Sequence, residues 1–198
     1  MYIPNQTAFT AAEKIILDTV LQVKTMLTGM SAGTKIETEN GWRNVQDLRA
    51  GDRVFTYDGG LRELIGMEHN VVSAALGHSL VHVPGGVLSN CDDTYVAPDQ
   101  LLLLESHFVE RETGRPNVLV QARDLCGLGG ISTVPVENQT QLFAPIFAQQ
   151  EIVWANSGML FHSANATSNF FAQPGKSQVQ AILQDMFADH DDLMPLAA

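Results

Sequence analysis

The residues best suited to metal chemistry lie in a short stretch near the middle of the chain. Two histidines four positions apart are followed by a thiol and a pair of carboxylates: His78, His82, Cys91, Asp92 and Asp93. Imidazole nitrogens, thiolates and carboxylates are all ligands of Zn²⁺. On a shared strand the two histidines would point to the same face, but that spacing fixes only two ligands. A solvated strand edge explains them without an ion, and we expect no metal site.

Two glycine-rich stretches and two cysteines add little further chemistry. Gly29–Lys35 lacks the four-residue gap before Gly-Lys-Ser/Thr of a phosphate-binding loop and leads into a strand, and Gly127–Gly130 is explained by a turn. We therefore expect no cofactor. Cys91 and Cys126 cannot form a disulfide framework, so we expect buried free thiols and a reducing compartment.

Composition bears on several classes of partner. The 198 residues carry a net charge of −11 and a pI near 4.8, whereas nucleic-acid phosphates require a basic surface. No apolar run approaches the ~18 residues of a membrane-spanning helix. Met1–Pro4 has neither the basic start nor the apolar core of a secretory signal. We expect no binding to nucleic acid or membrane, and a cytoplasmic location or export through an uncleaved C-terminal signal.

Two β-hairpins are predicted in the first third of the chain. Thr34–Glu39 alternates polar with apolar or β-branched residues, and Asn40-Gly41 separates it from Trp42–Val45. Asn-Gly between such runs predicts a type I′ turn, in which both central residues have positive φ. Arg53–Tyr57 is the next strand candidate and is closed by Asp58-Gly59-Gly60. Two tight turns so close together indicate an all-β core.

Short strands are predicted to continue through the middle of the chain. Turns separate apolar or β-branched runs, a pattern typical of a sandwich, barrel or other closed β-structure. The predicted strands are Leu80–Val83, Val87-Leu88, Tyr95-Val96, Leu101–Leu104, Phe108–Glu110, Val118–Gln121, Ile152–Ala155 and Met159–Phe161. At about 150 residues per domain, the length fits one domain with extensions.

Both ends of the chain are predicted to be helical. Apolar residues in Ala11–Leu27 recur at helical spacing, and Thr10 is a plausible N-cap. A second apolar stripe predicts a helix over Ser177–Ala188, preceded by a polar linker over Asn165–Gly175. We expect both helices to pack on the β-core or on a partner.

The hairpin region also resembles the opening of a Hint domain, the module of inteins and hedgehog-type autoprocessing proteins. The resemblance rests on Gly33-Thr34, the Gly-Trp after the turn, Val45–Leu48, and Gly51-Asp52 with Val54 and Thr56. Later matches are Ala97–Leu103 to the second block of the family, Val120–Leu125 and Gly127–Ile131 to bacterial stand-alone Hint proteins, Leu142–Gly158 to the last blocks, and Met159–Ser163 to the closing strand.

That resemblance implies a fold and a domain plan. The fold is a mainly β, pseudo-twofold horseshoe of short strands with flanking N- and C-terminal helices. The expected parts are an N-terminal helical extension over residues 1–28, a Hint-like β domain over 29–163, and a linker with an acidic helix over 164–198.

The chemistry of the family requires particular residues, which the resemblance maps onto this chain. A Cys or Ser four residues before the Gly-Thr attacks the preceding carbonyl carbon, and Gly29 stands there. A second-block histidine protonates the leaving amide nitrogen, and Gln100 stands there. Ala97 replaces the second-block threonine, and Ser163 replaces the terminal asparagine. Only His162 keeps the family's residue type.

The sequence therefore predicts a Hint fold without self-cleavage, acting as a binding or scaffold module for an unknown protein partner. For Gln100 we expect a structural hydrogen bond. The alternative is an active protein in which Thr28, Ser31 or Ser163 replaces the nucleophile and His162 is the base. Thr28 and Ser31 would need a shifted register, and neighbours on a strand such as His162 and Ser163 point to opposite faces.

The acidic C-terminal helix is a second candidate for contact with a partner. Its aspartates would suit a basic partner, although a solvated face explains them equally well: Asp185, Asp189, Asp191 and Asp192. The oligomeric state is left open.

Overall fold

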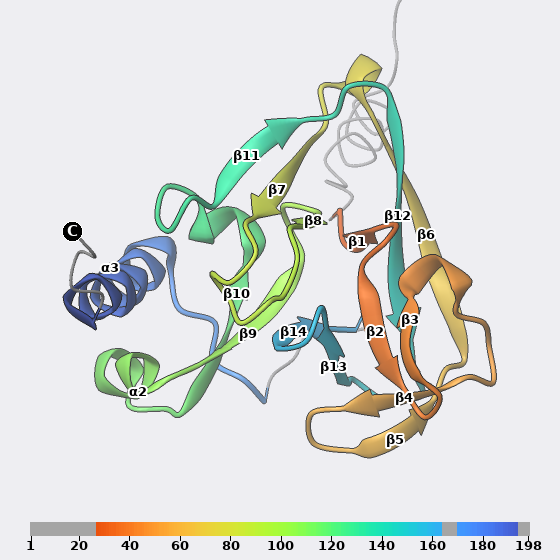
Figure 1. Ribbon diagram of the computed structural model, residues 1–198, viewed down its shortest axis with the longest axis horizontal. Coiled ribbons are helices and arrows are strands. Elements are labelled where there is room, and N and C mark those ends of the chain that lie inside the picture. Colours follow the sequence, from red (N-terminus) through yellow and green to blue (C-terminus); the bar gives the residue numbers. More distant parts are fainter. Residues whose placement is uncertain (1–26, 164–169, 194–198) are drawn as a thin grey trace, which may run out of the picture.

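The computed structural model describes residues 27–163 and 170–193, with side chains as far as residue 188. Most of this part of the chain is antiparallel β-structure (Figure 1). The strands are β1 Met30–Ser31, β2 Lys35–Thr38, β3 Gly41–Asn44, β4 Arg53–Thr56, β5 Gly60–Glu63, β6 Gly66–Ser73, β7 Ser79–Val83, β8 Thr94–Val96, β9 Leu101–Glu105, β10 Asn117–Gln121, β11 Ser132–Pro135, β12 Gln139–Ile146, β13 Ile152–Ala155 and β14 Met159–His162.

Helices and 3₁₀ turns connect and flank these strands. The α-helices are α2 His107–Thr113 and α3 Lys176–Leu193, and the 3₁₀ turns are η1 Val45–Asp47, η2 Ala74–Leu76 and η3 Ala122–Leu125. The protein is therefore mainly β with a C-terminal helix, as the sequence predicts. No helix in the described part of the chain is long and apolar enough to cross a membrane.

The strands form two sheets around a shared core. One sheet has the order β11-β7-β8-β1-β12-β6, and the other has the order β10-β9-β14-β13-β2-β4-β5, with β3 paired to β2. Strands β6 and β12 pair along their whole length and run side by side in Figure 1, far from α2 and α3. Met30, Ile36 and Phe161 are fully buried in the main core, so β1, β2 and β14 share one interior.

Both predicted hairpins are present, but the first turn differs from the prediction. Glu39 and Asn40 form the loop between β2 and β3, because Thr38 lies opposite Gly41. Of these residues only Gly41 has positive φ, at +89°, so the turn is not type I′. The Thr38 hydroxyl accepts a hydrogen bond from the Asn40 N–H, at 3.2 Å, and donates to the Gly41 carbonyl, at 2.7 Å. This side chain stabilises the alternative turn.

Two predicted strands are wrong. Phe108–Glu110 lies in helix α2, because the Ser106 hydroxyl caps the Val109 N–H and Gly114 ends the helix with φ +69°. Val87-Leu88 lies in a turn, where the Asn90 side chain accepts a hydrogen bond from the Leu88 N–H, at 3.0 Å. In both places local capping groups outweigh the β-propensity of the apolar residues.

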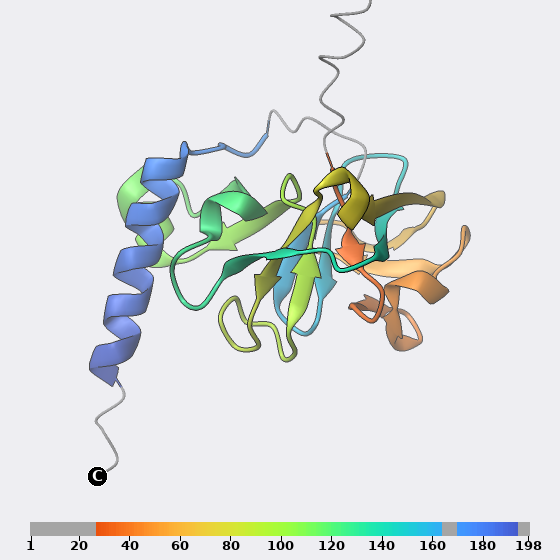
Figure 2. The same ribbon diagram turned by 90° about the horizontal axis from the view of Figure 1, so that it is seen from above.

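Helix α3 is confirmed and is longer than predicted. Val179, Ile182 and Leu183 are fully buried, and Figure 2 shows the helix lying along one end of the β-structure. Ala172, in the segment before α3, accepts a hydrogen bond from the Leu119 N–H of β10, at 2.9 Å. The helix is therefore part of the core.

Two other predictions concern the N-terminal helix and the C-terminal aspartates. The predicted helix over Ala11–Leu27, with its N-cap at Thr10, lies outside the described residues except for Leu27. Asp185 pairs with Arg111 of α2, so this aspartate has a partner within the chain. The side chains of the other three aspartates lie outside the described part.

Candidate functional site

The family positions named from the sequence converge on one buried side chain. Gln100 lies in the turn between β8 and β9 and is 2% exposed. Its Oε1 accepts a hydrogen bond from the Gly29 N–H, at 2.9 Å, and its Nε2 donates to the His162 carbonyl, at 2.9 Å, and to the Leu101 carbonyl, at 2.8 Å. Gln100 therefore joins the start of the β-module to its end.

These partners also fix which way the Gln100 amide faces. Two carbonyl oxygens need donors and one N–H needs an acceptor, so Nε2 must face His162 and Leu101 while Oε1 faces Gly29. A lone pair thus points at the Gly29 nitrogen. A group in this position accepts the proton of that amide and has none to give to it.

Residues 27–29 continue as an extended segment along Ala97–Asp99. Ala97 donates its N–H to the Gly29 carbonyl, at 2.9 Å, and Asp99 donates its N–H to the Leu27 carbonyl, at 3.2 Å. The Asp99 carboxylate accepts the Leu27 N–H, at 3.0 Å, and forms an ion pair with Arg123, at 2.5 Å. The backbone before β1 is therefore held on both sides of the Thr28–Gly29 peptide bond.

Asn70 adds a contact at the peptide bond itself. Its Nδ2 donates to the Thr28 carbonyl, at 3.2 Å, and to the Glu68 carboxylate, at 3.2 Å. The sequence reasoning missed both Asn70 and Asp99. Asp99 had no signal, since an aspartate after Ala-Pro is typical of a turn and turns are mostly exposed. Asn70 had none either, because its contact depends on where β6 lies in the fold.

Gly29 occupies a conformation and a space that favour glycine. Its φ is +116°, which side chains rarely adopt. A Cβ atom would lie 3.1 Å from both the Leu142 Cβ and the Phe143 carbonyl oxygen of β12. The backbone at the family's nucleophile position is thus packed closely against a neighbouring strand.

His162 is buried and has an unsatisfied nitrogen. The residue is 5% exposed, and no described residue is a hydrogen-bond partner of its Nε2. Burial lowers the pKa of the imidazole, and a hydrogen bond with the Ser163 backbone opposes this in part. The ring is consequently neutral at neutral pH, which is the state of a base.

Each of the three alternative nucleophiles has a defined place in the fold. The Ser163 hydroxyl accepts a hydrogen bond from the Glu151 N–H, at 3.0 Å. Thr28 precedes Gly29 and is half-buried, and Ser31 lies in β1 opposite Leu142. Among the described residues, no hydrogen bond links any of these hydroxyls to the His162 ring.

The metal-ligand types do not converge. His82 lies in β7 and contacts the Asp93 carboxylate through Nε2, at 3.0 Å, whereas His78 precedes the strand and accepts the Ser73 N–H, at 3.2 Å. The Gly85 N–H and His82 lower the pKa of the Asp93 carboxyl. Within the described part of the chain no three potential ligands form a group. Cys91 and Cys126 are free as predicted, but the expectation of burial is wrong, because Cys91 is exposed and Cys126 is half-buried.

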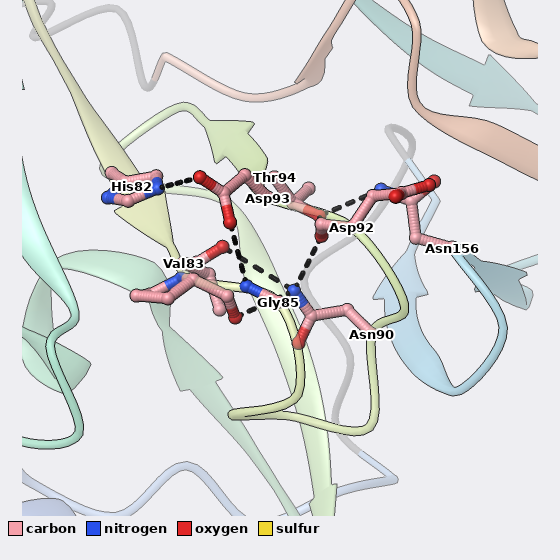
Figure 3. A network of polar contacts seen from close by, with 9 residues as sticks. His82, Val83, Gly85, Asn90, Asp92, Asp93, Thr94 and Asn156 are labelled. Carbon is pink, nitrogen blue, oxygen red and sulfur yellow. Dashed lines mark hydrogen bonds and ion pairs between the residues drawn. The ribbon is translucent and has the colours of Figure 1, made fainter.

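A polar network accounts for this region (Figure 3). Asn90 is 1% exposed, and its Nδ2 donates to the Pro84 carbonyl, at 3.0 Å, and the Asp92 carbonyl, at 2.8 Å. Asn156 donates its Nδ2 to the Thr94 hydroxyl, at 2.8 Å. The network ties the loop between β7 and β8 to the turn between β13 and β14, so its role is structural.

The fold and the site define a class of protein, the β-modules in which the first and last residues of the module meet at one buried site. In this chain Gly29 and His162 meet at Gln100. A Hint domain model matches residues 28–166, well over half of the chain. The chain belongs to the Hint domain family.

Solved structures with similar folds include inteins and an intein-like domain. A GSH-linked, splice-inactive variant of the AceL NrdHF class 3 split intein is 13% identical, with a TM-score of 0.48 over 70% of this chain and 99% of that one. The bacterial intein-like domain from Clostridium thermocellum is 14% identical, with a TM-score of 0.47 over 70% of this chain and 100% of that one. No curated protein matches the sequence.

Proposed function

We propose that this Hint protein no longer cleaves or splices its own backbone and that it acts as a non-catalytic binding or scaffold module. The observation that carries the proposal is the placement of the Gln100 amide. It contacts the Gly29 N–H, at 2.9 Å, where the chemistry of the family needs an acid, and an amide cannot release a proton near neutral pH.

The geometry around Gly29 supports the same conclusion. Glycine has no side chain that could attack the Thr28 carbonyl carbon. Asn70 and Asp99 hold the neighbouring backbone in ordinary hydrogen bonds, as a structural segment requires. A module that keeps the Hint fold without this chemistry retains only its surface with which to act.

The alternative is an active protein that uses a displaced nucleophile, and one observation favours it. The buried Nε2 of His162 has no described partner, and a neutral imidazole can accept a proton. Ser163 follows it directly, and Gln100 donates a hydrogen bond to the carbonyl of the intervening peptide bond, at 2.9 Å. Against this, the Ser163 hydroxyl is already bonded to the Glu151 N–H.

Intact mass of the freshly purified full chain tests the proposal. The protein is incubated for several days with and without a thiol or hydroxylamine, which capture ester and thioester intermediates, and is then denatured before analysis. We expect the mass of the 198-residue chain under every condition. A fragment cut next to Thr28 or Gly29, or between His162 and Ser163, would overturn the proposal.

The Ser163→Ala variant is the matched control for the alternative. It removes the hydroxyl and leaves the backbone pairing with Glu151 in place. If the wild type were cut at the end of β14 and this variant were not, Ser163 would be the nucleophile. We expect both proteins to remain uncut, with the variant lighter than the wild type by the one oxygen atom of the lost hydroxyl.

A further inference from the structure

A groove lies where α2 and α3 meet the β-structure, and none of Gly29, Gln100 and His162 lines it. Its volume is about 500 Å³, within the roughly 300–1,000 Å³ typical of ligand pockets. Its walls come from residues 87–89, from β9 and β14, and from both helices, which Figure 1 shows packed at the same end of the molecule. Residues far apart in the sequence therefore build one concave surface.

Apolar side chains, including one aromatic ring, form part of the groove. Leu104, Met159 and Leu160 are buried beneath it, and Trp154 and Met186 are half-buried beside it. Burial of an apolar side chain against such a surface is favourable at about 25 cal/mol per Å². The groove thus suits the apolar side chains of a ligand.

The rim carries two carboxylates and one imidazole, that of His107. Glu105 and Glu110 are exposed, and the described residues that line the groove include no Lys or Arg. The Tyr57 hydroxyl donates a hydrogen bond to the Glu105 carboxylate, at 2.5 Å, which holds this carboxylate in place. Arg111, next to Glu110, pairs with Asp185 and stacks over Phe108, at 5.3 Å, so its charge is already balanced.

We propose that this groove binds a short segment of a protein partner in which lysine or arginine alternates with apolar residues. The cations would meet Glu105 and Glu110, and the apolar side chains would enter the groove. A second copy of this chain is a poor occupant, because each copy carries a net charge of −11 and the two would repel. The inference gives a partner class to the proposed binding role, but it does not depend on the loss of self-cleavage.

The two tryptophans allow a direct test. Trp42 lies in β3, is 42% exposed and does not line the groove, so the Trp42→Phe protein reports from Trp154 alone. The probe is a capped seven-residue peptide of alternating leucine and lysine, added to the full-length protein. We expect a saturable change in Trp154 fluorescence that weakens as salt screens the charges.

Matched peptides and variants locate the interaction. A peptide with glutamate in place of lysine, or serine in place of leucine, should not bind saturably. The Glu105→Gln/Glu110→Gln protein should bind the basic peptide about tenfold more weakly at low salt, because rim charges contribute through screened electrostatics. Glu63→Gln is the control: Glu63 is exposed in β5 and outside the groove, and its loss should leave the Kd unchanged.

Four results would overturn the proposal. They are no saturable fluorescence change, equal binding of the acidic peptide, equal binding of the serine peptide, and a loss of affinity in Glu63→Gln as large as in the double variant. None of these results bears on the intact-mass experiment. Failure of the proposed peptide binding and failure of the proposed loss of cleavage are therefore distinguishable.

Discussion

Two buried polar clusters of this Hint domain differ in how completely their groups are satisfied. Around Asn90 and Asn156 both amides have hydrogen-bond partners, and the cluster fastens a loop. Around Gln100 the amide is equally well bonded, yet His162 beside it keeps a buried nitrogen with no described partner. An unpaired buried polar group costs free energy that a purely structural cluster has no reason to carry. The first cluster is thus fully paired, whereas the second leaves one buried nitrogen without a partner among the described residues.

Removal of the Asn90 amide should have the largest effect. Asn90→Ala leaves the Pro84 and Asp92 carbonyls and the Leu88 N–H without their side-chain partner. We expect the free energy of unfolding to fall by about 2–4 kcal/mol, since three partly buried side-chain hydrogen bonds are lost, each worth about 0.5–1.5 kcal/mol. Urea denaturation measures it, with the exposed amide of Asn44 removed as the control. A loss below about 1 kcal/mol would remove the distinction between the two clusters.

A side chain at Gly29 should be the next most costly change. Gly29 has φ +116° and lies against β12, whereas Gly33 has φ +92° and open space around it. Both alanine variants bear a backbone cost of about 1–2 kcal/mol, and Gly29→Ala adds overpacking, for a total of about 2–4 kcal/mol. Denaturation of the two variants side by side separates these terms. Equal losses in the free energy of unfolding would mean that β12 shifts to accommodate the new methyl group.

The His162 ring should make stability depend on pH. Burial lowers its pKa, so below the ordinary value of about 6.5 the unfolded chain takes up a proton that the folded chain does not. The contribution of the buried, neutral imidazole to stability is complete above about pH 6.5. It is lost as the pH falls from there toward the lowered pKa. The free energy of unfolding of His162→Phe should be within about 1 kcal/mol of the wild-type value at pH 7.5. At pH 5 the variant should be more stable relative to the wild type than it is at pH 7.5. A difference that stays constant between these pH values would contradict the assigned burial.

The exposed ion pair between α2 and α3 should contribute least to stability, so its loss is the reference for the two buried clusters. Asp185→Asn should cost no more than about 1 kcal/mol, because water and salt screen an exposed pair. The cost should vanish in 1 M NaCl, whereas the cost of Asn90→Ala should not. Thermal denaturation at two salt concentrations is the measurement. A salt-independent loss would indicate that Asp185 holds α3 in some other way.

The sequence predicts the elements whose signals are local. Asn40-Gly41 and Asp58-Gly59-Gly60 mark hairpins because turn chemistry is specified within a few residues. The Phe108–Glu110 error is local too, because the Ser106 cap and the Gly114 stop flank the apolar run and outweigh its β-propensity. Strand β6 was not predicted, since of its eight residues only Val72 is buried and there is no clear alternation.

The site divides along a similar line. The resemblance identified Gly29, Gln100 and His162, and the structure links all three through one amide. It gave no indication that Asn70 would contact the Thr28 carbonyl, across 42 positions of sequence, because this contact exists only once β6 is paired with β12. Contacts of that kind depend on the whole topology.

The backbone hydrogen bond from Leu119 to Ala172, together with the burial of α3, has a practical consequence. If the chain were nicked at the end of β14, the downstream piece would stay clamped to the body by its own packed helix. Gel filtration and native electrophoresis would then report an undivided particle. Only separation under denaturing conditions would reveal two polypeptides, because cleavage of the backbone would not by itself release the C-terminal piece.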